Sequence, residues 1–237
     1  LAIRRNLIMV GEEMVSVAYD SDVEMTPVKQ IEKVEGELFQ LAEKGRYDGG
    51  FQAFGTALNA SIQMAGEAFQ RDGGLSGVAT DLHDLDRQMG GLQRSDLIIL
   101  AGRPAMGKTS LVTNIAYNVA KNWRGDVTPE GHSKTVNGGI VGFFSLEMSS
   151  EQLATRILAE QAEISSSDIR RGRIHDNQFA KLVDVSNVMS KVPLYIDDTG
   201  GISVAQLAAR ARRLKRQKGL DLLIVDYLQL LSGSSKA

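Results

Sequence analysis

The first part of the chain carries apolar residues at helical spacing and lacks the alternation typical of a strand. One helix is expected after Thr26 and Pro27, which suit a cap and a first turn, and Gly45 is a natural end for it. Its apolar positions are Ile31, Val34, Leu38 and Leu41. A second helix is expected over about 53–71, with a stripe of Phe54, Leu58, Ile62, Ala65 and Phe69. That stripe lies on one face, so it needs a cover, from this chain or from a neighbouring subunit.

From about residue 78, short apolar runs alternate with helical stretches. The runs that predict buried strands are 97–100, 140–146, 193–196 and 222–225. Helices are expected over 110–122, from about 151, over about 176–191 and over about 203–218. In the helix 176–191, Phe179, Leu182 and Val183 are expected to be buried. The polar stretch 125–139 is rich in turn formers and predicts an exposed loop. Strands separated by helices predict an α/β fold with a mostly parallel sheet covered on both faces.

A phosphate-binding motif follows the first of these strands, where open parallel sheets place their sites. Residues 102–109 read GRPAMGKT and match GxxxxGK(S/T) in full. The glycines let backbone N–H groups turn inward around phosphate oxygens, and the next helix adds the positive end of its dipole. Lys108 can reach the β- and γ-phosphates, and Thr109 can ligate Mg²⁺. The motif predicts that ATP is bound by Gly102, Arg103, Pro104, Ala105, Met106, Gly107, Lys108, Thr109 and Ser110.

Two carboxylates lie at the ends of later strands. Asp226 follows the run 222–225, where P-loop enzymes place the aspartate that holds Mg²⁺, usually through water. Glu147 ends the run 143–146 and could polarise the water that attacks the γ-phosphate. The alternative for Glu147 is a glutamate favoured by the dipole of the next helix. Glu147 and Lys108 are therefore the predicted catalytic residues, and Thr109 and Asp226 the predicted metal ligands.

Other polar features leave two readings open. Asp197 and Asp198 either face the site or belong to a turn or cap, since 199–201 has the composition of a turn. Ser149 and Gln152 have capping-box spacing. The helix 203–218 either binds DNA or is an outer helix with a solvated face, with Leu207, Ala211 and Leu214 turned inward. Its basic residues are Arg210, Arg212, Arg213, Lys215, Arg216 and Lys218.

The amino-acid composition excludes several kinds of protein and site. The 237 residues have a formal net charge of −2, which argues against a basic surface coat but leaves room for a locally basic channel. The lack of cysteine excludes disulfides and thiolate chemistry and fits the cytoplasm. Three scattered histidines, His83, His132 and His175, predict no zinc site. No apolar run approaches the ~20 residues of a membrane helix. The start at Leu1 reads like the middle of a helix, so the natural N-terminus is expected further upstream.

Several stretches, in order over residues 80–231, resemble the motor of DnaB-type replicative DNA helicases, a RecA-like P-loop NTPase core. These stretches are Asp84-Leu85-Asp86, Gly90-Gly91-Leu92, 96–109, 143–148, 193–198 and 226–230. Ala105 and Ser95 depart from the serine and glycine usual in the family, but neither position is a glycine of the phosphate loop. In a RecA-like sheet, we expect the strand before Glu147 to lie next to the strand before the phosphate loop.

The resemblance implies a division of the chain and a function. Residues 1–25 would be the tail of the N-terminal collar domain, 26–77 a helical linker region that includes the subunit-docking helix, and 78–237 the ATPase domain. The family forms homohexamers that encircle single-stranded DNA and move 5′→3′ by ATP hydrolysis at the bacterial replication fork, with primase and a helicase loader as partners. Its DNA loops and arginine finger lie further along, so the domain is expected to be incomplete after Asp226 and this chain alone weak or inactive.

Two alternatives remain at this level. One is a recombination ATPase of the RecA or RadA type, and the other is a nucleotide-binding module without turnover. The apolar stripe of the linker and the run Asp226-Tyr227-Leu228-Gln229 favour the helicase.

Overall fold

The computed structural model describes residues 2–19, 53–69, 75–127 and 133–232, and also residues 27, 30–31, 33–34, 36–38 and 41. The chain divides into two compact units. The first comprises Leu1–Gln70 and Val204–Arg210, and the second comprises Arg71–Ser203 and Ala211–Ala237. In the part of the chain so described, no helix combines the length and apolar character needed to cross a membrane.

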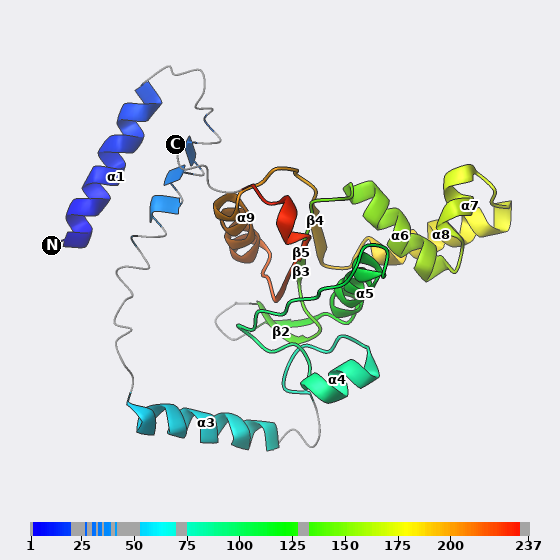
Figure 1. Cartoon of the computed structure of the whole chain (residues 1–237), viewed down its shortest axis with the longest axis horizontal. Coiled ribbons are helices and arrows are strands. Elements are labelled where there is room, and N and C mark those ends of the chain that lie inside the picture. The colour runs from blue at the N-terminus through cyan, green and yellow to red at the C-terminus, as the bar shows by residue number, and fades with distance from the viewer. Residues whose placement is uncertain are drawn as a thin grey trace. The chain divides into compact units, whose positions relative to one another are not determined.

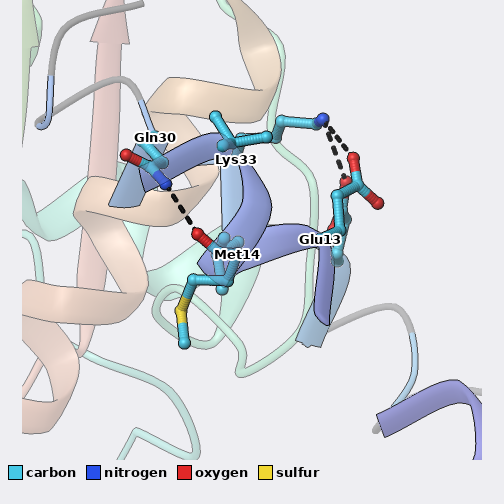
Figure 2. Close-up of a pocket in the computed structure, with 7 residues that line it drawn as sticks. Glu13, Met14, Gln30 and Lys33 are labelled. Carbon is cyan, nitrogen blue, oxygen red and sulfur yellow. Dashed lines mark hydrogen bonds and ion pairs between the residues drawn. The ribbon is translucent and has the colours of Figure 1, made fainter. Parts of the chain in front are cut away.

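The first unit contains helix α1 (Ala2–Tyr19) and helical residues between 27 and 41. Figure 2 shows how they meet: Lys33 Nζ lies 2.7 Å from the Glu13 carboxylate, and the Gln30 amide donates to the Met14 carbonyl at 3.0 Å. The hydrogen bond from Lys33 to Glu13, and the attraction between their charges, raise the pKa of Lys33. These contacts line a shallow hollow that contains no residue of the phosphate motif. The predicted cap at Thr26 and stop at Gly45 lie outside the described residues.

Helix α3 (Phe54–Phe69) confirms the second predicted helix, and its apolar stripe is exposed from Phe54 to Ile62. Phe54 is 78% exposed, and Leu58 and Ile62 are also exposed. The stripe is therefore available to a covering surface, as its one-sided pattern predicts.

The second unit is built on a three-stranded parallel sheet. Strand β3 (Val141–Ser145) lies between β4 (Leu194–Asp197) and β5 (Leu222–Asp226). These strands confirm three of the four predicted runs. All five residues of β3 are buried, as expected for a central strand with helices on both faces.

The core forms where helix α5 (Lys108–Lys121) and helix α6 (Ser150–Ala162) meet β3. It comprises Ala116, Val119, Ala120, Val141, Phe143 and Leu153. On the opposite face, a Cβ at Gly142 would lie 3.1 Å from Leu214 of helix α9 (Val204–Gln217). Glycine at this position therefore lets α9 pack directly on the strand.

Helices α7 (Ser166–Arg171) and α8 (Asp176–Met189) pack with α6 to one side of the sheet (Figure 1). Their small core is formed by Ala162, Ile164 and Leu182. Leu182 of α8 is buried, as predicted. The predicted burial of Phe179 and Val183 is wrong, because these side chains are 60% and 43% exposed. Helix α8 turns Leu182 and Val185 toward this core, so Phe179 and Val183 lie outside it.

The predicted strand 97–100 is wrong. These residues form no strand and are all exposed, with Leu97 at 87% and Ile99 at 79%. The expected neighbour of β3 is wrong as well, because its two edges are occupied by β4 and β5. An apolar run satisfies its backbone as a strand only where a partner edge receives it, and no local pattern specifies that edge.

The predicted loop 125–139 contains most of an antiparallel pair, β1 (Arg124–Val127) and β2 (Ser133–Asn137). Long-range hydrogen bonds hold it. The Asp221 carboxylate accepts from the Thr135 hydroxyl at 2.8 Å and from the Ile140 N–H at 2.9 Å, and the Trp123 indole donates to Thr135. The predicted loop is therefore wrong for most of this stretch. Its polar residues form a strand pair that is held by Asp221, which lies far away in the sequence.

Candidate nucleotide-binding site

The phosphate loop turns sharply before α5. Gly107 caps the helix with φ = 85°, and Ala105 also has a positive φ of 63°. The Met106 N–H donates to the Arg103 carbonyl, and the Leu111 N–H donates to the Gly107 carbonyl at 2.9 Å as the helix begins. Left-handed residues in a short loop are the geometry that lets successive N–H groups converge on an anion. An alanine in this conformation is uncommon and marks a constrained turn.

Lys108 folds back over this loop. Its stem passes near the first glycine of the motif, since a Cβ built at Gly102 would lie 3.4 Å from the Lys108 Cγ, an ordinary van der Waals contact. Its Nζ lies 5.7 Å from the centre of the Tyr227 ring. Since Tyr227 directly follows β5, the fold brings the phosphate loop and the end of β5 together.

The carboxyl ends of β3 and β5 are fixed to each other. Ser145 and Asp226 are register partners, and the Leu146 N–H donates to the Asp226 carbonyl at 2.8 Å. Glu147 therefore begins the loop beside Asp226. Asp226 is 8% exposed, and its carboxylate accepts no hydrogen bond from the described residues. A nearly buried carboxylate in this situation fits a hard cation such as Mg²⁺, which prefers oxygen ligands.

Thr109 lies half-buried in the first turn of α5, and Ser110 is exposed. A threonine hydroxyl and an aspartate carboxylate are oxygen donors of the kind that Mg²⁺ takes with a triphosphate. The residues present therefore fit both the nucleotide and the metal.

Glu147 does not cap α6. The helix begins at Ser150, and its N-cap is Ser149, whose hydroxyl accepts from the Gln152 N–H at 3.3 Å. Glu147 is exposed, and its carboxylate makes no hydrogen bond or ion pair with the described residues. The capping of this helix N-terminus is therefore carried by Ser149.

Asp198 takes part of that role. Its carboxylate accepts from the Ser150 N–H at 2.8 Å and from the Ser150 hydroxyl at 2.9 Å, and these bonds lower the pKa of Asp198. Asp197 accepts from the Thr199 N–H at 3.1 Å in a turn. Both aspartates thus have capping or turn roles.

A buried network that no motif predicted joins the segment before the loop to α5. The Thr80 N–H and hydroxyl donate to the Asp86 carboxylate, with distances of 2.8 to 3.1 Å. Thr80 is fully buried and Asp86 is 7% exposed. The Asn118 amide of α5 donates to the Thr80 carbonyl at 3.1 Å, and Asn122 donates to Asp81 at 2.6 Å. Asp86 lies in helix α4 (His83–Met89). The one signal of this network in the sequence was the family resemblance of the stretch Asp84-Leu85-Asp86.

The basic helix α9 matches an outer helix. Leu207 and Ala211 are each 8% exposed, and Leu214 faces β3 at Gly142. Arg210, Arg212 and Arg216 all interact with other groups of the protein. The burial of Leu207 and Ala211 confirms the inward face predicted for this helix.

Comparisons with known proteins agree with this geometry. The model of the DnaB-like helicase C terminal domain matches residues 77–237. The replicative DNA helicase DnaB of Rickettsia conorii is 42% identical over the whole chain, which covers 47% of that protein. DnaB of Geobacillus stearothermophilus is 32% identical, with 100% of this chain and 48% of that protein covered. The chain spans about half the length of these curated relatives.

Solved structures give the same answer for the fold. An ATPase domain aligns with a TM-score of 0.65 and 26% identity, over 79% of this chain and 61% of that chain. A DnaB-like replicative helicase, described with its interactions with primase, aligns with a TM-score of 0.63 and 24% identity, over 99% of this chain and 51% of that chain. The order of motifs, the parallel sheet and these matches together place the chain in the family of DnaB-like helicase C-terminal domains.

Proposed function

We propose that this chain carries the ATP-driven motor of a replicative DNA helicase, which works as a hexameric ring and moves 5′→3′ on single-stranded DNA at the replication fork. The observation that carries the proposal is the site itself: a complete phosphate-loop motif lies beside the end of β5, which pairs with the end of β3, in a chain whose relatives are replicative helicases. The family match favours this function over a recombination ATPase.

Each residue has a chemical role in this proposal. The N–H groups of residues 102–109 and the N-terminus of α5 bind the phosphates, and Lys108 neutralises charge on the β- and γ-phosphates. Thr109 and Asp226 would hold Mg²⁺, which would supply charge neutralisation for the phosphates. Glu147 accepts a proton from water as the water oxygen bonds to the γ-phosphorus and the bond to the bridging oxygen breaks. ADP and phosphate leave as products.

The ring and its partners belong to the same proposal. The exposed stripe of α3 supports docking on a neighbouring subunit, because an apolar helix face of this kind requires a cover. A primase partner is supported by the solved relative that was described with primase. A helicase loader is proposed from the family resemblance alone.

Nucleotide binding is tested by titrating the chain with a fluorescent ATP analogue carrying a methylanthraniloyl group. Lys108→Met removes a charge-assisted contact of roughly 1.5–3 kcal/mol, so binding should weaken about ten- to a hundredfold. Lys121→Met is the matched control, because Lys121 lies in the last turn of the same helix. Equal affinity in both variants would refute the pocket assignment.

Turnover is tested by measuring ATP hydrolysis with and without single-stranded DNA, and unwinding of a forked duplex, in the protein that contains this chain. Glu147→Gln should keep nucleotide binding and lose about 10²–10⁴-fold in rate. Glu151→Gln, an exposed glutamate in the first turn of α6, should change neither. A full rate in Glu147→Gln would remove the general base and leave the binding site intact. Hydrolysis without unwinding would favour the recombination ATPase.

A further inference from the structure

One contact of Lys108 is not used by the roles assigned above. Its Nζ lies 5.7 Å from the centre of the Tyr227 ring, within the ~6 Å over which an aromatic face attracts a cation. Among the described residues, no carboxylate forms an ion pair with Lys108. The ring of Tyr227 therefore supplies the attraction for this ammonium group in that part of the chain.

The ring is held in place from both sides along the backbone. Before it, the Asp226 carbonyl accepts from the Leu146 N–H at 2.8 Å. After it, the Tyr227 carbonyl accepts from the Leu230 N–H at 3.1 Å, in the short helix η1 (Leu228–Leu230). The stem of Lys108 passes near Gly102 in the phosphate loop. The ammonium group thus lies between the phosphate loop and a ring attached to β5.

We propose that Tyr227 is a positioning residue for Lys108, whose ring holds the ammonium group at the phosphate site before the nucleotide arrives. The inference rests on the proposed nucleotide-binding function. A lysine loses much rotamer freedom when it is fixed, so a side chain that is already ordered binds phosphate at a lower entropic cost. The Tyr227 hydroxyl makes no hydrogen bond with the described residues, so the ring carries this role.

The placement of the ring can be read without nucleotide, from the Cε protons of ¹³C-labelled lysines by NMR. Lys108→Met identifies the resonance. In the unaltered chain, the Lys108 resonance should lie upfield of the resonance of the exposed Lys218, because the ring current shields protons above the face of the Tyr227 ring. Tyr227→Phe should keep this shift and Tyr227→Leu should remove it. A Lys108 resonance at the position of Lys218 in the unaltered chain would overturn the proposal, whether or not the variants fold.

Its consequence is measured with the same fluorescent ATP analogue. Tyr227→Leu should weaken binding about two- to fivefold, whereas Tyr227→Phe should bind like the unaltered chain. In a Lys108→Met background, measured at the higher concentrations that weak binding requires, Tyr227→Leu should have no further effect. Unchanged affinity in Tyr227→Leu, or an equal loss in both backgrounds, contradicts positioning through Lys108. If circular dichroism shows Tyr227→Leu to be unfolded, Tyr227→Met takes its place.

The two proposals fail in different ways. If Lys108→Met bound nucleotide like the unaltered chain, the proposed function would be wrong. If Lys108→Met lost binding while Tyr227→Leu had no effect, the function would stand and Tyr227 would have no positioning role.

Discussion

The buried carboxylate of Asp86 offers a direct test of how the segment before the phosphate loop is held on α5. Asp86→Ala would remove the acceptor of the Thr80 N–H and of the Thr80 hydroxyl. Thr80 has no exposed surface, so solvent outside the fold cannot replace the lost partner. The Thr80 carbonyl accepts a hydrogen bond from the Asn118 amide, so losing the Asp86 carboxylate also loosens the attachment of this segment to α5.

The magnitude follows from the bonds that are lost. A hydrogen bond to a charged group contributes roughly 1.5–3 kcal/mol, and a buried donor left without a partner costs about 1–3 kcal/mol. Two such donors give a loss of about 3 kcal/mol at the lower end, which allows for a water molecule entering the space that the carboxylate leaves. This is a large part of the 5–15 kcal/mol that typically holds a domain together.

The assay is urea unfolding, followed by circular dichroism and by the fluorescence of Trp123, the single tryptophan. Asp84→Ala is the matched control, since Asp84 lies in the same helix and pairs with Arg87 at the surface. The control should change the unfolding free energy by less than about 0.5 kcal/mol. Equal, small losses in the two variants would show that the Thr80–Asp86 bonds do not hold this segment, and the reasoning from burial would be refuted.

Two further predictions concern the loop and the cap of α6. Gly107→Ala should weaken binding of the ATP analogue and lower stability by about 1 kcal/mol, because a Cβ is disfavoured at φ = 85°. Gly200→Ala is the control, because a Cβ at Gly200 would meet open space. Equal affinity and stability in the two variants would contradict the requirement for glycine at position 107. The pKa of Asp198 is lowered from 3.8 by its bonds from Ser150, so its stabilisation is present above that value and is lost as the pH falls through the lowered one. Urea unfolding of Asp198→Asn should therefore differ from the unaltered chain at about pH 6 and converge with it on acidification, and a difference that does not depend on pH would exclude this role.

Features that depend on neighbours in the sequence were predictable. The phosphate loop needs glycine at 107, where the backbone is left-handed, and the helix that follows is specified by its own apolar face. Asp226 ends an apolar run that is a strand in the fold, and Ser149 caps the helix that its spacing predicts. These features rest on local backbone geometry and short hydrogen bonds, which the sequence states directly.

Pairings between distant segments were not predictable from the pattern. The run 97–100 is as apolar as the strands of the sheet, yet no described strand pairs with it. The polar stretch around Thr135 forms a strand pair because Asp221 lies within reach. Phe179 stays exposed because α8 turns Leu182 and Val185, and not Phe179, toward the core that it shares with α6.

The candidate site divides in the same way. The sequence by itself determined which side chains are candidates for the chemistry: Lys108, Thr109, Glu147 and Asp226 are each marked by a motif or by the end of an apolar run. Only the tertiary structure decided what lies around them, namely the ring of Tyr227 beside Lys108 and the buried Thr80–Asp86 pair behind α5. The physical reason is that a motif constrains one stretch of backbone, whereas burial and side-chain contacts depend on which strands and helices come together.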